Sequence, residues 1–366
     1  MALQAGIVGL PNVGKSTLFN AITKSSVEAA NYPFATISPN VGVVEVPDHR
    51  LKDICELVVP KKVVPTTFEF TDIAGLVKGA SKGEGLGNQF LANIRETDAI
   101  VHVVRCFDSN DITHVEGSVD PIRDIEIINL ELALADLSQV ETRLKKVGRK
   151  ANLKDKDSII EKNVLLQLQE TLEAGKPVRS LDLNEAEELI VRNFQMLTSK
   201  PMIYVANMDE NEVANPETNK YYQQVKELAD SENNDVIPVC ARIEEELCEM
   251  DEEDKALFLE DLGIKESGLD GVIKSAYHIL DLQTYFTAGV QEVRAWTFKK
   301  GMKAPECAGI IHTDFQKGFI RAETYSYDDL MTYKSEAELR NHGRLRLEGK
   351  EYVVQDGDIM EFRFNV

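Results

Sequence analysis

The segment from Gly9 to Thr17 constrains the fold of this chain more than any other. It reads GLPNVGKST and matches the pattern G-x-x-x-x-G-K-[ST]. The apolar residues 5–8 before it indicate a buried strand, and residues 18–22 after it have the apolar spacing of a helix. A loop between a strand and a helix N-terminus points its backbone amides at a bound anion, and Lys15 adds a positive charge. The segment therefore predicts a phosphate-binding loop in an α/β domain, with Ser16 as a candidate ligand of Mg²⁺.

A second motif ends a predicted strand over residues 67–73. It reads Asp72-Ile73-Ala74-Gly75 and has the pattern D-x-x-G. In P-loop proteins the acid at this place holds Mg²⁺, usually through water, and the glycine amide meets the γ-phosphate. Four residues are weak evidence alone, but their place two strands after a phosphate-binding loop predicts a nucleoside triphosphatase of the GTPase type. The apolar run over residues 98–107 predicts a further buried strand of a parallel sheet.

Composition limits the possible partners and the compartment. The 366 residues carry a formal net charge of −21, which disfavours overall attraction to DNA or to an anionic membrane. Any contact with nucleic acid would then need a local basic patch. The five cysteines show no C-x-x-C spacing, which argues against a disulfide framework or a zinc site. The first strand begins close to Met1 and no run of 18 apolar residues occurs, so a cytoplasmic protein without a signal peptide is expected.

The chain is expected to divide into four segments. Residues 1–125 and 200–280 are predicted to form the two parts of the nucleotide-binding domain. Residues 126–199 are predicted to form an inserted antiparallel helical hairpin, and residues 281–366 a separate α+β domain of short strands and turns. In this last segment strands are expected at residues 294–298, 309–315, 344–348, 351–354 and 359–364.

The hairpin prediction rests on a heptad-like spacing of apolar residues. Its first helix is expected to bury Ile127, Leu130, Leu134, Leu137 and Leu144. Basic residues gather at the predicted tip, and four of them are candidates for contact with a partner: Arg149, Lys150, Lys154 and Lys156. Most such runs are only solvated, so a binding role and a plain exposed face both remain open. The acidic run over residues 244–261 is expected to coat an exposed helix and to favour solubility.

With these motifs identified, the chain resembles the YchF branch of the Obg-like ATPases, within the translation-factor-related P-loop GTPases. The resemblance covers essentially the whole length, and residues 79–88, which read GASKGEGLGN, are especially specific. It implies a P-loop G domain with the inserted helical hairpin, followed by a β-grasp (TGS) domain. It also implies hydrolysis of ATP in preference to GTP. The expected partner is the ribosome, as the large subunit or the 70S particle, with rRNA or tRNA as further contacts.

The motifs and the resemblance together nominate the site residues. Lys15 and His114 are the expected catalytic residues. Mg²⁺ is expected to lie near Ser16 and Asp72, and the resemblance adds Thr36 as a third ligand. The expected ATP-binding residues are Asn12, Val13, Gly14, Lys15, Ser16, Thr17, Gly75, Asn207, Met208 and Glu210.

Two positions depart from ordinary GTPases. Leu76 follows the D-x-x-G glycine, where many GTPases carry the glutamine that orients the attacking water. An alkyl side chain cannot do this, and the resemblance offers His114 as the group that positions or deprotonates water. The alternative is a surface histidine without a role, whereas His102, in mid-strand, is expected to be a core residue. Asn12 is a candidate for K⁺ binding, by analogy with potassium-dependent GTPases, or else it only shapes the loop.

The base-binding motif favours adenine. Guanine-specific P-loop proteins use N-K-x-D, whereas Asn207-Met208-Asp209-Glu210 stands here. Glu210 is one methylene longer than aspartate, and Met208 offers an apolar contact in place of lysine. Backbone groups and Asn207 could meet the amine and ring nitrogen of adenine, so ATP is expected to bind more tightly than GTP. In the competing view Glu210 bends to reach guanine, or Asp209 substitutes for it after a register shift.

Three rival functions follow from the same motifs. The first is a GTPase of the same architecture. The second is a nucleotide-dependent binding protein with little turnover. A small-molecule kinase shares the phosphate-binding loop but should carry an acceptor pocket and a lid, and no segment of the sequence has those features.

Overall fold

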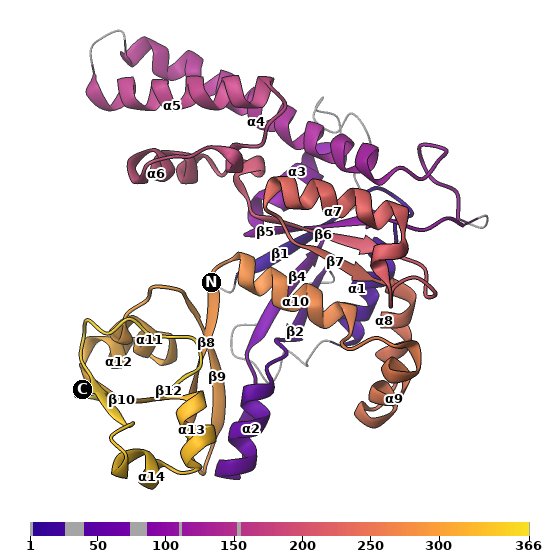
Figure 1. Cartoon of the computed structure of the whole chain (residues 1–366). Helices are drawn as coiled ribbons and strands as arrows, with labels where there is room; N and C mark the ends of the chain where they lie inside the picture. Colours follow the sequence, from indigo (N-terminus) through magenta and orange to yellow (C-terminus); the bar gives the residue numbers. More distant parts are fainter. Residues whose placement is uncertain (1–2, 26–39, 74–85, 110–111, 152–154, 366) are drawn as a thin grey trace. The chain divides into compact units, whose positions relative to one another are not determined.

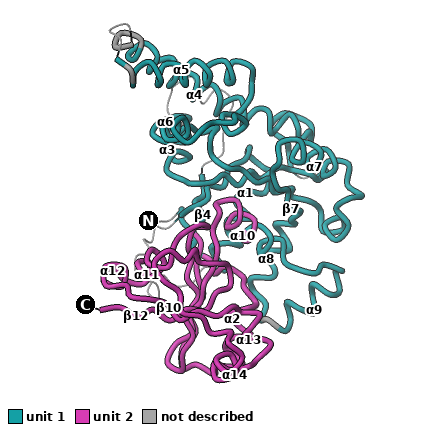
Figure 2. The backbone as a smooth tube through the Cα atoms, turned by 60° about the vertical axis from the view of Figure 1, so that its left-hand side comes forward, with its two compact units in different colours: residues 1–43, 69–272 teal, residues 44–68, 273–366 magenta. Residues whose placement is uncertain are grey.

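The computed structural model describes residues 3–25, 40–73, 86–109, 112–151 and 155–365. The chain forms two compact units, shown in separate colours in Figure 2. The first unit comprises residues 1–43 and 69–272, and the second comprises residues 44–68 and 273–366. Across the described ranges, no helix has the length and apolar content needed to cross a membrane.

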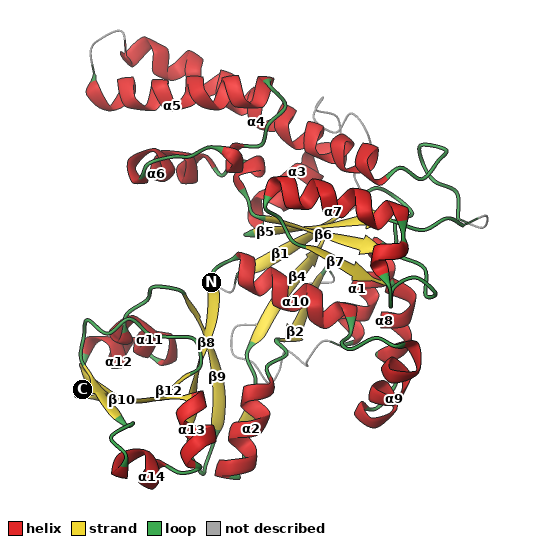
Figure 3. Ribbon diagram, in the orientation of Figure 1, coloured by secondary structure: helices red, strands yellow, loops and turns green. Residues whose placement is uncertain are grey.

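A six-stranded sheet forms the centre of the first unit, with helices on both sides of it (Figure 3). Its strand order is β2-β4-β1-β5-β6-β7, and the registers of β1 with β4 and β5, of β5 with β6 and of β6 with β7 are all parallel. Both β5 and β6 are buried along their whole length, as expected for a parallel sheet covered on two faces. The strands are β1 (Gln4–Val8), β2 (Val41–Glu45), β4 (Thr67–Asp72), β5 (Ala99–Arg105), β6 (Met202–Asn207) and β7 (Val236–Val239).

The helices of this unit follow the strands in the manner of a doubly wound fold (Figure 1). The α-helices are α1 (Lys15–Lys24), α3 (Leu86–Glu96), α4 (Pro121–Ala151), α5 (Lys156–Glu173), α6 (Glu185–Phe194), α7 (Lys220–Glu232), α8 (Ala241–Leu247) and α9 (Glu252–Leu262). A further helix, α10 (Gly268–Ile279), begins in this unit and continues into the second unit after residue 272. Short 3₁₀ turns occur at Val178–Ser180, Leu197–Ser199 and Pro216–Thr218.

Helices α4 and α5 form the predicted hairpin, but the buried seam of α4 differs from the predicted one. Leu130 and Leu134 are 56% and 39% exposed, so their assignment to the seam was wrong. The seam instead runs through Ala133, Leu137, Val140, Leu144 and Val147, a regular alternation of four and three residues, and it packs on α5. Small and β-branched side chains allow the two helices to approach closely, and the sequence interpretation had favoured the larger leucines.

Helix α6 closes the hairpin and begins at a capping box. The Asn184 side chain accepts hydrogen bonds from the Ala186 and Glu187 amides, and the Glu187 carboxylate accepts one from the Asn184 amide. These reciprocal bonds satisfy backbone donors that the first turn of the helix would otherwise leave unpaired.

The second unit also contains a six-stranded sheet, of order β11-β10-β12-β8-β9-β3. Its first elements come from residues 44–68, far from the rest in sequence: Leu51 and Ile54 of α2 pack against Phe286 and Ile359. The strands are β3 (Val63–Val64), β8 (Leu282–Ala288), β9 (Val293–Lys299), β10 (Phe319–Ser326), β11 (Arg346–Glu348) and β12 (Asp358–Phe364). The helices are α2 (His49–Val58), α11 (Ala304–Ile311), α12 (Thr313–Lys317), α13 (Tyr327–Tyr333) and α14 (Glu336–Asn341).

Two predicted strands of this unit were wrong. Residues 309–315 belong to α11 and α12, because Ala304, Cys307 and Ala308 pack at helical spacing into the core. Residues 351–354 form only an isolated bridge between Lys303 and Val353, and β11 pairs with β10 instead of with them. The short apolar run at 309–311 fits a strand or a helix equally well, so only tertiary packing decides it.

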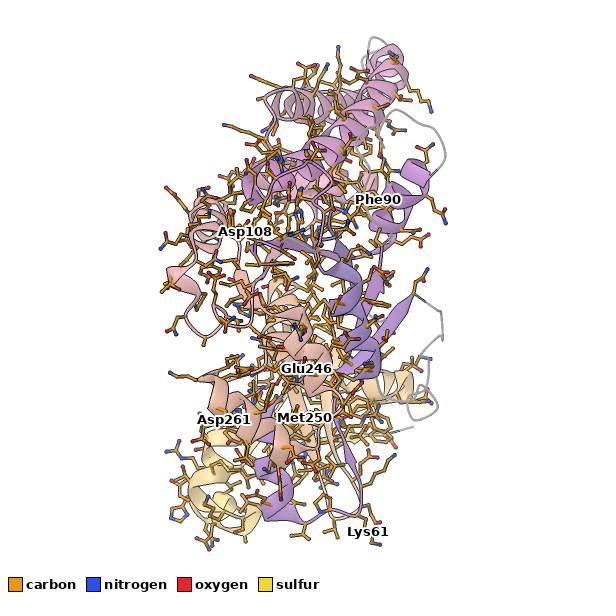
Figure 4. The ribbon with its side chains drawn as sticks, turned by 90° about the vertical axis from the view of Figure 1, so that its right-hand side faces the viewer. Lys61, Phe90, Asp108, Glu246, Met250 and Asp261 are labelled. Atoms are coloured by element: carbon orange, nitrogen blue, oxygen red, sulfur yellow. The ribbon has the colours of Figure 1, made fainter. Side chains whose placement is uncertain are left out.

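One residue of the acidic run over residues 244–261, which was predicted to be exposed, is buried. Figure 4 labels Glu246, Met250 and Asp261 of this stretch. Glu244, in α8, is only 4% exposed, which contradicts its assignment to an exposed acidic surface. Its carboxylate accepts hydrogen bonds from the Ser267 hydroxyl at 2.6 Å and the Gly268 amide at 2.8 Å, and burial raises its pKa. Glu244 therefore stabilises the start of α10.

Candidate nucleotide-binding site

The phosphate-binding loop joins β1 to α1, as the sequence predicts. Gly14 precedes the helix with φ of 93°, a left-handed conformation that favours glycine. A Cβ atom at Gly14 would lie 2.0 Å from Nδ2 of Asn207, so both the backbone angle and the available space require glycine there. The N-terminal amides of α1 are thereby presented as an anion-binding site.

Lys15 and Asp72 meet beside this loop. Ile7 of β1 is in register with Asp72 at the end of β4, which brings the acid to the loop. The Lys15 ammonium donates to Oδ1 of Asp72, and Lys15 is 8% exposed. Ser16 is exposed and lines the same cavity.

The oxygen donors in this region fit Mg²⁺. The Ser16 hydroxyl and the Asp72 carboxylate are hard ligands, and Mg²⁺ usually binds one or two protein oxygens together with phosphate oxygens and water. The described part of the chain contains no cluster of three His, Cys, Asp or Glu side chains suited to a metal ion. Thr36, Gly75 and Leu76 lie outside the described residues.

A cavity of about 840 Å³ extends from the phosphate-binding loop along the ends of β5, β6 and β7. This volume lies in the range of cavities that hold small-molecule ligands. Its lining residues are Leu10, Pro11, Asn12, Gly14, Lys15, Ser16, Thr17, Phe107, Asp108, Ser109, Ile112, Asn207, Met208, Asp209, Glu210, Asn211, Cys240, Ala241 and Arg242. Val13, another predicted ATP-binding residue, is 1% exposed and lies within the loop.

Asn207 connects three loops at the centre of this cavity. Its Oδ1 atom accepts a hydrogen bond from the Ala241 amide at 3.0 Å, and its Nδ2 atom donates to the Val13 carbonyl at 2.9 Å. Both ends of the side chain are thus bonded to backbone. In this arrangement Asn207 positions the phosphate-binding loop.

The base end of the cavity is formed by residues 208–211 and by the loops after β5 and β7. Met208 is 2% exposed and Glu210 is exposed, and both line the cavity. Asp209 does not face the cavity freely, because its Oδ1 atom accepts from the amide and the side chain of Asn211. Sequence reasoning missed Phe107, Asp108 (labelled in Figure 4), Ile112 and Arg242. Their place directly after strands of a parallel sheet was the available signal.

The loop after β5 is held by a buried arginine that the sequence analysis did not identify. Arg105 is 1% exposed, and its guanidinium donates to the carbonyls of Phe107 and Ile112, both at 3.1 Å. Its Cζ atom also lies 4.6 Å from the centre of the Phe107 ring. Burial lowers the pKa of Arg105. Arg105 therefore fixes the two apolar residues that this loop adds to the base end of the cavity.

His114 is placed differently from the other predicted site residues. It is 6% exposed and does not line the cavity. Its Nε2 atom lies 2.8 Å from Oδ2 of Asp124, in the first turn of α4, and its Nδ1 atom accepts from the Glu116 amide at 3.1 Å. These partners assign a neutral imidazole with its proton on Nε2.

The backbone of Thr113, the residue before His114, contacts the phosphate-binding loop. Asn12, which has a positive φ of 64°, donates from Nδ2 to the Thr113 carbonyl at 3.1 Å. His102, in contrast, is 1% exposed in β5 and stacks at a tilt on Tyr204, which confirms it as a core residue. Burial lowers the pKa of His102 to about 3.

The phosphate-binding loop, the acid at the end of β4 and the adjoining cavity define a P-loop nucleoside triphosphatase. A family model described as "50S ribosome-binding GTPase" matches residues 4–132, and the YchF-GTPase_C family model matches residues 282–365. The protein named "Ribosome-binding ATPase YchF" of Bacillus subtilis (strain 168) is 62% identical over 366 residues, with 100% of each chain covered. The chain therefore belongs to the YchF family.

Further relatives agree with this assignment. The protein of the same name from Escherichia coli O157:H7 is 55% identical over 366 residues, again with 100% of each chain covered. A solved structure described as the Schizosaccharomyces pombe YchF GTPase superposes with a TM-score of 0.89 at 43% identity and covers 99% of this chain and 97% of that one. A GTP-binding protein from Pyrococcus horikoshii OT3, at 21% identity and a TM-score of 0.62, shares the fold.

Proposed function

We propose that this chain is a ribosome-binding ATPase that uses the cavity beside the phosphate-binding loop for ATP. The observation that carries the proposal is the meeting of Lys15, Ser16 and Asp72 at the N-terminus of α1, in a chain whose full-length relatives are named ribosome-binding ATPases. Its site of action is then the cytoplasm, where ribosomes translate.

The chain's own groups divide the work of phosphate binding. The amides at the start of α1 and the Lys15 ammonium bind the β- and γ-phosphates. Because Lys15 is bonded to Asp72, a phosphate must draw the ammonium away and leave the carboxylate free for a water ligand of the metal. Ser16 and Asp72, with Thr36 by resemblance, would hold Mg²⁺, which would neutralise charge on the phosphate oxygens.

Water activation is assigned to His114, and it needs a rearrangement. Both ring nitrogens are engaged, so the imidazole can take no proton from water while it is bonded to Asp124 and Glu116. Catalysis therefore requires His114 to leave this position. A cation such as K⁺ near Asn12 is a second proposed contribution, which comparison of ATP turnover in potassium and sodium salts would test.

Adenine selectivity is assigned to Met208 and Glu210. Met208 packs as an apolar surface at the base end, and Glu210 cannot reproduce the geometry of the guanine-binding aspartate. A GTPase remains the second candidate, because the S. pombe structure is described as a GTPase. Calorimetric titration with ATP and GTP decides between them, and tighter binding of ATP is expected. Preference for GTP by tenfold or more would overturn the ATPase assignment.

Single-turnover hydrolysis with and without ribosomes tests turnover itself. We expect ribosomes to accelerate the chemical step, since His114 must be repositioned. If hydrolysis stayed at the uncatalysed rate under both conditions, the chain would be a nucleotide-dependent binding protein instead.

Ribosome association is assigned to basic residues of the hairpin tip. The side chains of Arg149, Lys150, Lys154 and Lys156 lie outside the described residues, so this part of the proposal rests on sequence and resemblance. Their joint neutralisation should weaken binding to the large subunit or the 70S ribosome, through contacts with rRNA or a bound tRNA, and should spare ATP hydrolysis. Unchanged co-sedimentation would direct attention to the second unit.

A further inference from the structure

A second cavity, of about 760 Å³, lies between α3, α4 and α6. Among the described residues, none lines both this cavity and the nucleotide cavity, so we treat it as a separate site in the first unit. It is lined by Asn88, Leu91, Arg95, Ala135, Ser138, Gln139, Thr142, Arg143, Lys146, Asn193, Phe194 and Gln195.

The charge of this cavity is opposite to that of the chain. Among the described residues, its lining includes the cations Arg95, Arg143 and Lys146 and no carboxylate, whereas the chain carries a net charge of −21. The Nε atom of Arg143 donates to Oε1 of Glu161 at 2.5 Å, and Glu161 is not part of the lining. The cavity therefore favours an anion.

Arg95 adds an incompletely bonded donor. Its Nη2 atom lies 3.4 Å from Oε1 of Gln139, a long contact. Its Nε atom is buried and has no hydrogen-bond partner among the described residues. A buried donor without an acceptor is unfavourable, so an acceptor that enters the cavity at Arg95 gains by pairing with this donor.

An aromatic ring stands next to the cations. The half-buried ring of Phe194 lines the cavity, and the Arg143 guanidinium lies 5.9 Å from the ring centre. Gln139 fixes the backbone at this point, because its Nε2 atom donates to the Phe194 carbonyl at 2.7 Å. Proteins that bind single-stranded nucleic acid combine a basic groove for the backbone with an aromatic ring on which a base stacks.

We propose that the cavity between α3, α4 and α6 binds a nucleotide of single-stranded RNA, with the phosphate at Arg95, Arg143 and Lys146 and the base against Phe194. This inference rests on the proposed ribosome binding, since ribosomal RNA supplies such a nucleotide. An RNA strand is favoured over a free nucleotide as the ligand, because the sequence of α4 continues with basic residues from Arg143 to Arg149 and Lys150.

Fluorescence anisotropy with a labelled single-stranded RNA dodecamer tests this site, using the full chain. Lys146→Gln should weaken binding about fivefold and lower the slope of log K against log salt by about 0.7, the loss of one phosphate contact. Lys145→Gln is the matched control: its side chain is exposed, precedes Lys146 on α4 and does not line the cavity. We expect it to bind as the wild type does.

Phe194→Leu separates stacking from charge. It should weaken binding about tenfold and leave the salt slope unchanged, because it removes a base contact and no phosphate contact. Equal effects of the Lys145 and Lys146 changes on the salt slope would overturn the site, since they would show diffuse attraction to α4. Displacement of the RNA by millimolar uridine monophosphate as effectively as by unlabelled RNA would assign the cavity to free nucleotides and overturn the choice of RNA.

Co-sedimentation distinguishes this inference from the function on which it rests. If wild-type protein fails to sediment with ribosomes, the proposed ribosome binding is wrong. If wild-type and Lys146→Gln, Phe194→Leu double-variant proteins sediment equally at two salt concentrations, only the cavity assignment is wrong. A circular dichroism melt confirms that each variant is folded.

Discussion

The two ends of the nucleotide cavity are built in different ways. The phosphate end consists of consecutive residues at the turn from β1 to α1, with backbone amides and Lys15 as its binding groups. The base end is assembled from side chains that follow three separate strands, β5, β6 and β7. In the proposed binding mode, triphosphate binding depends on a local backbone geometry, whereas selectivity among bases depends on the tertiary positions of a few side chains.

The largest effect is expected at the phosphate end. Among the described residues that line the cavity, Lys15 is the one lysine, and Lys15→Ala should lower ATP turnover about 10³-fold because the developing charge loses its positive partner. Lys24→Ala, on the same helix but exposed and paired with Glu249, is the matched control. Steady-state phosphate release measures both. Similar rates for the two variants would show that the phosphates bind elsewhere.

His114→Ala should lower turnover roughly 10²-fold and leave the affinity for ATP nearly unchanged. The reason is that His114 does not line the cavity and would act only on the attacking water. Single-turnover rates together with calorimetric binding test this split. A full-rate variant would return His114 to a structural role beside Asp124.

Asn207 joins the two ends, so its removal should affect both. Asn207→Ala leaves the Val13 carbonyl and the Ala241 amide without partners, which should lower the free energy of unfolding by about 1–3 kcal/mol. ATP and GTP should lose affinity equally, about tenfold. Urea denaturation and calorimetry measure the two effects. A selective loss of ATP affinity would mean that Asn207 recognises adenine directly.

The most confined effect, on selectivity alone, is expected at the base end. Met208→Lys combined with Glu210→Asp should shift the ratio of ATP to GTP affinity by about tenfold toward GTP, since guanine donors gain a well-placed carboxylate. Met208→Leu with Glu210→Gln controls for loss of the native residues without a guanine partner. If both double variants changed the ratio alike, the base would not contact this strand end.

The difference between the phosphate end and the base end also explains which parts of the site could be predicted from the sequence. The loop from Gly9 to Thr17 and Asp72 could be placed because a local pattern specifies them. The role of Arg105 could not, since nothing in its sequence signals that its side chain folds back on its own loop. The buried position of His114 could not be predicted from the sequence either, because it depends on Asp124, ten residues away on another element.

The hairpin and the second unit show a related limit. Heptad spacing predicted two packed helices, but it placed Leu130 and Leu134 in the seam because large apolar residues were preferred over Ala133 and Val140. In the second unit α2 and β3 come from residues 44–68, and the sequence gives no sign that this segment belongs with residues 273–366. Such long-range pairing is set by packing, which a local pattern does not record.

The length of helix α4 determines how a movement of the hairpin tip reaches His114. Its 31 residues form one helix of about 46 Å, with Asp124 in the first turn and the hairpin tip at the far end. The first turn of α4 holds His114 by one hydrogen bond of 2.8 Å, and the rest of the helix can act on this bond as a lever. A tilt of about 5° at the base corresponds to about 4 Å of travel at the tip, so a modest force on the tip acts with a long arm on that bond.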